Sequence, residues 1–155
     1  MRILAIILSI FISASVYACS TDGIFPDKSP ECTPGSVYEE VTAEIICVPG
    51  YSKTVRKTTA SMKREVYEKY NIPINKRKEF VLDHLISLQI GGTNEIPNLF
   101  PQRSTGIINS RTKDKIENYL KRQVCKGNIT LQEAQGLIVE DWLMVWEDYS
   151  ERGDD

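Results

Sequence analysis

Apolar side chains recur at helical spacing in the C-terminal third of the chain. From Asn109 or Ser110 to Cys125 they fall on one face, and Gly127 follows as a helix stop. The next segment, roughly Leu131 to Tyr149, opens on Thr130 and Glu133 in the arrangement of a capping box. Its apolar stripe is typical of a core-facing surface and comprises Ala134, Leu137, Ile138, Trp142, Val145 and Trp146. These patterns predict two amphipathic helices.

The middle of the chain changes from a helical to a strand pattern. Thr59 to Tyr70 predicts a basic helix that stops before a proline. Glu79 to Leu88 is rich in strand formers, and Gly91-Gly92 ends it in a turn. A short returning strand is expected at Leu99 and Phe100. The sequence therefore predicts the α+β class, with a small hairpin among helices.

The N-terminus has the pattern of a secretory signal peptide. A basic start, Met1-Arg2, precedes an apolar run from Ile3 to Ala18 that contains no acid and ends in small residues. The run is short for a membrane span, which needs about 20 apolar residues. We therefore expect residues 1–18 to be cleaved, and the protein to be exported to the periplasm or secreted.

The remaining chain is expected to form one domain. A content of 41% hydrophobic and 26% charged residues is ordinary for a globular protein and excludes collagen-like, low-complexity and multi-span membrane proteins. Residues 19–34 are rich in Ser, Asp, Gly and Pro and predict an irregular lead-in. Residues 35–150 would be the domain, and 151–155 an acidic tail.

Charge is distributed unevenly along a chain whose net charge is only -2. Ser52 to Lys78 carries nine bases and two acids, whereas Glu133 to Asp155 carries eight acids and one base. The basic segment can be a phosphate-binding face, with Lys53, Arg56 and Lys57 as contacts. The alternative, which charge alone favours, is a pair of solvated helical faces.

Export would place the four cysteines, Cys19, Cys32, Cys47 and Cys125, in an oxidising compartment that favours disulfides. Four cysteines allow three pairings, and all three stay open at this point. The spacings contain no short CxxC-type chelate, which argues against a zinc site. Lipidation at Cys19 is a minority interpretation, because Tyr17 fits a lipoprotein box poorly.

The chemistry-bearing residues are centred on the single histidine, His84, which follows Asp83. An imidazole near its ordinary pKa can accept a proton from water, and a neighbouring carboxylate can hold a hard cation such as Mg²⁺, with Mn²⁺ or Zn²⁺ as alternatives. Asn98 could fix the imidazole tautomer, and Asn109 could supply a second metal ligand from the next helix. Lys113 would hold a phosphate. This set predicts phosphodiester hydrolysis with one divalent metal.

The segment Phe80 to Gly92, followed by Asn98-Leu99-Phe100-Pro101-Gln102, resembles the HNH endonuclease motif. It is most similar to small exported bacterial HNH-like proteins, and the resemblance extends from Thr33 to Tyr149. It implies a ββα-metal fold and cleavage of DNA, with RNA as an alternative substrate and little sequence specificity. By the resemblance, His84 is the general base, Asp83 a metal ligand and Asn98 the residue that orients His84.

The third motif position departs from the many HNH enzymes that place His or Asn there, because the chain has no second His. Asn109 is the candidate ligand by order and spacing, with Arg111 and Gln102 as alternatives. The segments around Cys47 and Cys125 look shared with the subgroup. The resemblance therefore favours a disulfide between these two and leaves Cys19 to pair with Cys32.

Two other functions compete with an active nuclease. A catalytically degenerate HNH-like module would bind nucleic acid or a protein partner, and a lipid-anchored envelope protein would keep the fold for structural reasons. A nuclease would have intact metal ligands, whereas the degenerate module would lack them. The lipid-anchored protein would carry a lipid on Cys19. The sequence specifies neither the biological target nor an immunity protein as a partner.

Overall fold

The computed structural model describes residues 18–151. Except for Ala18, the expected signal peptide lies outside the described residues, as do residues 152–155 of the expected acidic tail. Across the described part, no helix is long and apolar enough to cross a lipid bilayer.

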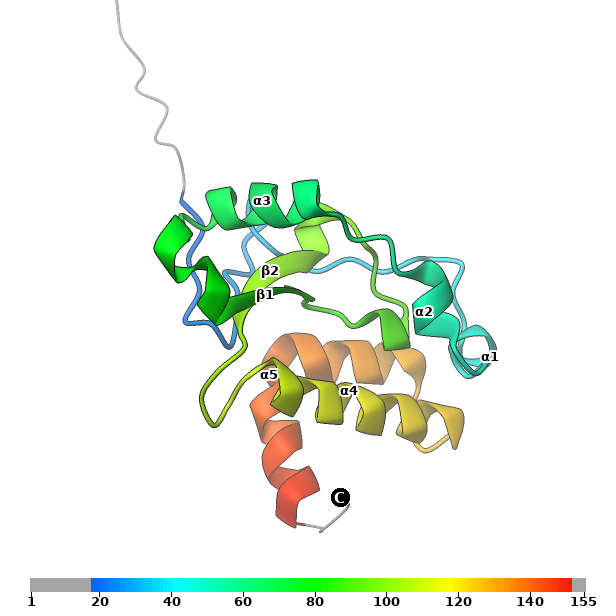
Figure 1. Cartoon of the computed structure of the whole chain (residues 1–155). Helices are drawn as coiled ribbons and strands as arrows, with labels where there is room; N and C mark the ends of the chain where they lie inside the picture. Colours follow the sequence, from blue (N-terminus) through cyan, green and yellow to red (C-terminus); the bar gives the residue numbers. More distant parts are fainter. Residues whose placement is uncertain (1–17, 152–155) are drawn as a thin grey trace, which may run out of the picture.

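The fold is a small two-stranded sheet surrounded by helices, which confirms the α+β class. Figure 1 shows the hairpin between α3 on one side and α4 and α5 on the other. The elements in chain order are α1 (Ala43–Ile46), α2 (Tyr51–Val55), α3 (Ala60–Lys69), the 3-10 helix η1 (Ile74–Glu79), β1 (Phe80–His84), the 3-10 helices η2 (Leu88–Ile90) and η3 (Ile96–Asn98), β2 (Leu99–Arg103), α4 (Ser110–Cys125) and α5 (Leu131–Glu151).

The hairpin pairs β1 and β2 antiparallel, with Phe80 opposite Arg103 and His84 opposite Leu99. β2 is longer than expected because it continues through Pro101. A two-stranded sheet leaves alternate N–H positions of each strand on a free edge, where a residue without an N–H is tolerated. The strand following the turn therefore spans five residues, and a loop of residues 104–109 leads from it to α4.

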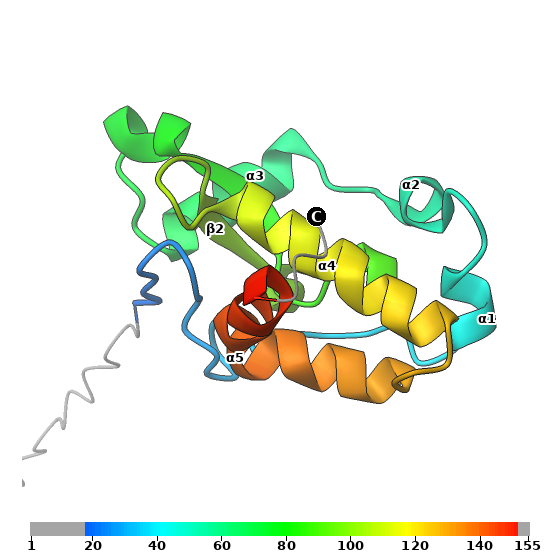
Figure 2. The ribbon, with the colours of Figure 1, turned by 90° about the horizontal axis from the view of Figure 1, so that it is seen from below.

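Helix α5 is not continuous, which corrects the prediction of one helix over this segment. Asp141 has extended backbone angles (φ -161°, ψ 93°), and its side chain accepts a hydrogen bond from the Leu143 backbone N–H at 2.9 Å. Asp141 thereby caps the second half of the helix. The ammonium group of Lys28 donates to the carbonyl oxygens of Val139 and Glu140, at 2.5 and 2.9 Å, and so caps the first half. Figure 2 shows the two halves running in different directions.

The largest apolar core lies where α4, α5, α1 and η2 meet. Its fully buried members are Ile46, Ile90, Ile116, Leu120, Ala134, Ile138 and Trp142. Leu137, predicted as part of the buried stripe, is instead 40% exposed, and Trp146 is only partly buried. The break at Asp141 changes the direction of the helix. The two halves therefore bury different faces, and a single stripe of apolar positions predicts the buried residues of neither half fully. A second cluster, built around Val66, Leu85, Leu99 and Phe100, packs beneath α3.

The cysteines pair as the resemblance implies. Cys47 is bonded to Cys125 and Cys19 to Cys32, with Cα–Cα distances of 5.7 and 5.6 Å. The bridge of sequence separation 78 joins the end of α1 to the end of α4, and closing a loop of that size stabilises by about 4 kcal/mol in the chain-entropy model. Two disulfides are compatible with an oxidising, exported location.

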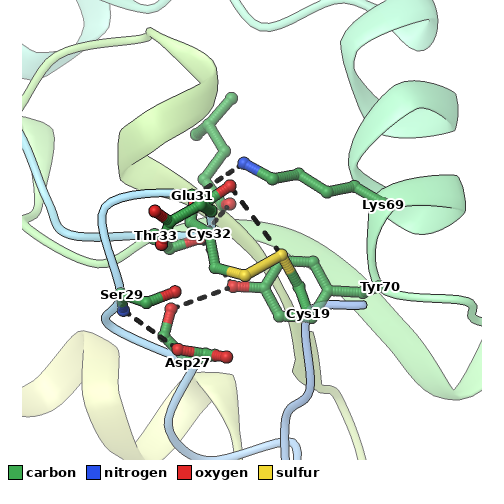
Figure 3. The surroundings of a disulfide bond; sticks show 9 residues. Cys19, Asp27, Ser29, Glu31, Cys32, Thr33, Lys69 and Tyr70 are labelled. Atoms are coloured by element: carbon green, nitrogen blue, oxygen red, sulfur yellow. Dashed lines mark hydrogen bonds between the residues drawn. A yellow bond between two sulfur atoms is a disulfide. The ribbon is translucent and has the colours of Figure 1, made fainter. Parts of the chain in front are cut away.

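The lead-in is fastened to α3 beside the Cys19–Cys32 bridge (Figure 3). The Lys69 ammonium group donates to the Cys32 carbonyl oxygen at 2.7 Å, and the hydroxyls of Tyr70 and Thr33 lie 2.6 Å apart. The segment is irregular, as predicted, but it is packed against the domain and not a separate tail.

Candidate functional site

Asp83 and His84 occupy the last two positions of β1, so their side chains project from opposite faces of the hairpin. Asp83 faces α4, since Lys113 of that helix contacts its carboxylate. The Asp83 side chain is 19% exposed, whereas His84 is only 3% exposed. The pair therefore presents one partly accessible carboxylate and one nearly buried imidazole.

Lys113 is fully buried between β1 and α4, which corrects the expectation that it contacts phosphate. Its ammonium group donates to Asp83 Oδ2 at 3.3 Å, to the His84 carbonyl oxygen at 2.7 Å and to Glu117 Oε1 at 2.5 Å. An ammonium group has three N–H donors, and all three are used here. Lys113 positions the strand end and has no donor left for a ligand.

The contacts of Lys113 continue through Glu117 to the turn after β1. The Ser87 hydroxyl donates to Glu117 Oε2 at 2.7 Å. Burial disfavours the charged form of Lys113, but the carboxylates of Asp83 and Glu117 outweigh burial and raise the pKa of Lys113 above its ordinary value. Lys113 therefore stays a cation, and the group Asp83–Lys113–Glu117–Ser87 links β1, α4 and the turn into one polar network.

The imidazole of His84 is oriented by Asn94, a residue that the sequence analysis did not single out. His84 Nε2 lies 3.4 Å from Asn94 Oδ1. Three other hydrogen bonds fix which way the Asn94 amide points. Its Oδ1 accepts from the Lys57 backbone N–H at 3.1 Å. Its Nδ2 donates to the Val55 carbonyl oxygen at 2.8 Å and to the Tyr38 hydroxyl at 3.1 Å. An oxygen acceptor facing Nε2 requires that nitrogen to carry the proton. In the neutral ring, Nδ1 is then the basic nitrogen.

Burial lowers the pKa of His84 to about 4, and the positive charge of Arg56 acts in the same direction, while Asp83 opposes both. The imidazole is consequently neutral at pH 7 and can accept a proton. A general base must start without the proton, but a ring with a pKa of about 4 is a weaker base than an imidazole with its ordinary value of 6.5.

Asn98 holds the turn after β1, and its side chain is not hydrogen-bonded to the imidazole, which corrects its expected role. Its Oδ1 accepts from the Ile86 backbone N–H at 2.9 Å, and its Nδ2 donates to the carbonyl oxygens of Ile86 and Thr93 at 2.9 and 2.8 Å. The turn is so tight that a Cβ on Gly92 would lie 1.8 Å from the Ile86 carbonyl oxygen. Asn94, in the same loop, occupies the position expected of Asn98.

Asn109 is the N-cap of α4. Its Oδ1 accepts from the Arg111 backbone N–H at 2.8 Å, and its Nδ2 donates to the Gly106 carbonyl oxygen at 2.5 Å. Both atoms of its side-chain amide are thus already hydrogen-bonded, one to the preceding loop and one to the first turn of α4. Of its two alternatives at the third motif position, Arg111 is exposed and Gln102 is fully buried on β2.

Basic and acidic side chains lie near the Asp83–His84 pair. Lys53, Arg56 and Lys57 are exposed on and just after α2, and the backbone bond from Lys57 to Asn94 places this segment beside His84. Asp114, which the sequence analysis also missed, is exposed on α4. Desolvation and the neighbouring Asp83 carboxylate raise the pKa of Asp114. Two carboxylates of like charge therefore lie within electrostatic reach of each other.

A hollow of about 360 Å³ lies on the side of Asn94 that faces α2. Two tyrosines, Tyr38 and Tyr51, line it together with Val55 and Lys57. The hollow adjoins the site through Tyr38 and Val55, since both accept a hydrogen bond from Asn94.

The chain matches no protein-family model, no curated protein and no solved structure. Within residues 18–151, no group of three His, Cys, Asp or Glu side chains comes together as a metal site. A cation at Asp83 would therefore need further oxygen ligands from amides, water or phosphate.

Replacing Lys113 by methionine removes the cation that separates two carboxylates. We expect Lys113→Met to lower the free energy of unfolding by about 3 kcal/mol, because breaking a buried ion pair leaves an uncompensated charge. Adding Glu117→Leu should restore much of the loss, since it removes the buried charge as well. Urea unfolding measures both effects, with the exposed Lys126→Met as control. Equal stability of Lys113→Met and Lys126→Met would contradict the structural role of Lys113.

Stability should depend on pH through His84, the only histidine. The unfolded imidazole binds a proton below its ordinary pKa of 6.5, whereas the folded one does so only near 4. The free energy of unfolding should therefore fall as the pH falls from 6.5 to 4, by about 3 kcal/mol in total from this group. The difference between wild type and His84→Gln across this window isolates the effect from carboxyl titrations. A constant difference would show that the folded imidazole titrates normally.

Proposed function

We propose that this protein is an exported, metal-dependent endonuclease of the HNH type that hydrolyses phosphodiester bonds of DNA with little sequence specificity. The observation that carries the proposal is the neutral imidazole of His84, held in one tautomer at the end of β1, with the Asp83 carboxylate on the preceding residue. RNA is the alternative substrate.

The order of elements around this pair supports the HNH assignment. Two antiparallel strands are followed by a helix, and the Asp-His pair at the end of the first strand is attached to that helix through Lys113. The turn between the strands is tied to itself by Asn98. This is the arrangement that the resemblance to a ββα-metal core implies, and it includes the residues on which the resemblance depends.

In the proposed reaction His84 Nδ1 accepts a proton from a water molecule as the water oxygen attacks the phosphorus. The bond from phosphorus to the leaving oxygen breaks, and that oxygen is protonated by solvent. Asn94 keeps the ring oriented, and Lys113 keeps Asp83 at the strand end. A divalent cation at Asp83, with Mg²⁺ expected first and Mn²⁺ or Zn²⁺ as alternatives, would neutralise charge on the phosphate and the leaving oxygen.

The exposed bases beside the imidazole supply the proposed contacts to the nucleic-acid backbone. Arg56 and Lys57 are placed next to His84 by the Lys57–Asn94 bond, and Lys53 lies one turn earlier on α2. Contacts to phosphate give affinity without reading sequence. The proposed enzyme therefore uses this segment for binding and Asp83 with His84 for cleavage.

Loss of the imidazole should abolish cleavage. We expect His84→Ala to reduce metal-dependent nicking of a plasmid by at least about 100-fold, the effect of removing a general base. Added imidazole should restore part of the activity, a rescue that a merely structural histidine would not give. His84→Gln, which fills more of the space, controls for folding. Wild-type protein that binds DNA but cleaves none with Mg²⁺, Mn²⁺ or Zn²⁺ would favour the degenerate binding module instead.

The basic pair should determine the salt dependence of DNA binding. Each phosphate contact contributes about 0.9 to the slope of log affinity against log salt concentration for duplex DNA. Arg56→Gln with Lys57→Gln should therefore lower the magnitude of the slope by about 1.8, whereas Lys126→Gln on the far end of α4 should leave it unchanged. Fluorescence anisotropy at several salt concentrations measures both. Equal slopes would place the nucleic acid on another face.

A further inference from the structure

Gln102 is fully buried on β2, and neither its amide oxygen nor its amide nitrogen has a hydrogen-bond partner in the described part of the chain. A buried polar group without a partner costs about 1–3 kcal/mol, so it calls for an explanation such as an ion or a water molecule at that place. The unpartnered side-chain amide of Gln102 is therefore the observation from which we infer a bound ligand.

The hairpin register places Gln102 on the same face as Asp83. Gln102 lies opposite Val81, and Asp83 follows two residues later on β1. Paired residues of an antiparallel sheet project to one face, and residues two apart on a strand share that face. Gln102 is thus the diagonal neighbour of Asp83, at a separation within reach of a long side chain.

The other amides proposed or found near the site are already engaged. Asn109 uses both of its amide atoms to cap α4, Asn98 uses both to hold the turn, and Asn94 uses both around the imidazole. Asp83 Oδ2 receives the Lys113 ammonium group, while Oδ1 receives no hydrogen bond from any described residue. Gln102 and Asp83 Oδ1 carry uncommitted oxygens on this face of the hairpin, and the exposed Asp114 carboxylate of α4 lies within electrostatic reach of Asp83.

We propose that Gln102 Oε1 is a protein ligand of the divalent cation, together with Asp83 Oδ1. The inference rests on the proposed function and assigns the third motif position to β2 in place of the helix start. Amide carbonyl oxygens are ordinary ligands of Mg²⁺ and other hard cations, and a neutral ligand adds no further charge beside Asp83 and Glu117. Water and phosphate oxygens would fill the remaining positions from the exposed side of Asp83.

The test measures Mn²⁺ binding to the disulfide-bonded chain without nucleic acid, by isothermal titration calorimetry and by the change in melting temperature. Gln102→Met has nearly the same shape and no amide. It should raise the melting temperature of the metal-free protein by about 3 °C, because it removes the unpaired group, yet weaken Mn²⁺ binding at least about tenfold.

Gln102→Glu should give the opposite pair of effects. A carboxylate at this place should lower the metal-free melting temperature through an unpaired buried charge and tighten Mn²⁺ binding about tenfold, because it is a stronger ligand. Asn109→Ser is the matched control: a serine keeps the helix cap, and Mn²⁺ affinity should stay at the wild-type value.

Three outcomes would overturn the assignment. The first outcome is wild-type Mn²⁺ affinity in Gln102→Met together with loss of Mn²⁺ binding in Asp83→Asn. It would reject Gln102 as a ligand but not the proposed metal-dependent nuclease, and the amide would then hold a buried water molecule. Loss of binding in Asn109→Ser would return the third position to Asn109. Absence of Mn²⁺ binding in the wild type itself would reject both this inference and the metal dependence of the proposed function.

Discussion

The ammonium group of Lys113 is the interaction on which the arrangement of the site depends. It is buried among the Asp83 carboxylate, the His84 carbonyl oxygen and the Glu117 carboxylate, and so joins the end of β1 to the first two turns of α4. The two carboxylates cannot both stay charged in this environment without a cation between them. Because one side chain contacts both residues of the Asp-His pair, the direction of β1 and the position of the pair are fixed together.

Local signals predicted α3, the hairpin and the helical segments of α4 and α5, but not the short helices α1 and α2 or the three 3-10 helices. Thr59 caps α3 through the Met62 backbone N–H, and Thr130 and Glu133 form the expected capping box, because such caps depend only on neighbouring residues. The break in α5 escaped prediction for the opposite reason. It is stabilised by Lys28, which lies 111 residues before the carbonyl of Val139, and no periodicity within the helix contains that information.

The candidate site divides in the same way. Asp83 and His84 were expected inside a strand-forming segment that runs to Leu88, whereas β1 ends at His84 and the 3-10 helix η2 follows. The partner of the imidazole was not predicted either, since Asn94 and Asn98 lie in one loop and only its three-dimensional path decides which of them faces the ring. One signal could have revealed the burial of Lys113. Glu117 lies four residues later, on the same face of the helix, so the lysine had a partner in sequence before the structure was known. The metal, its ligands and the activity stay predictions.

The Lys28 contact has a consequence for how the chain reaches its native state. Lys28, near the N-terminus of the described residues, caps the first half of α5, the last helix of the fold, across separations of 111 and 112 residues. Contacts between such distant segments are closed late in folding and slow it. During synthesis the part of the early segment around Thr33 can already dock on α3, but Lys28 lacks its two carbonyl acceptors until Val139 and Glu140 have been made. The packing of the early segment is therefore completed in two stages, the second of which waits for the last helix.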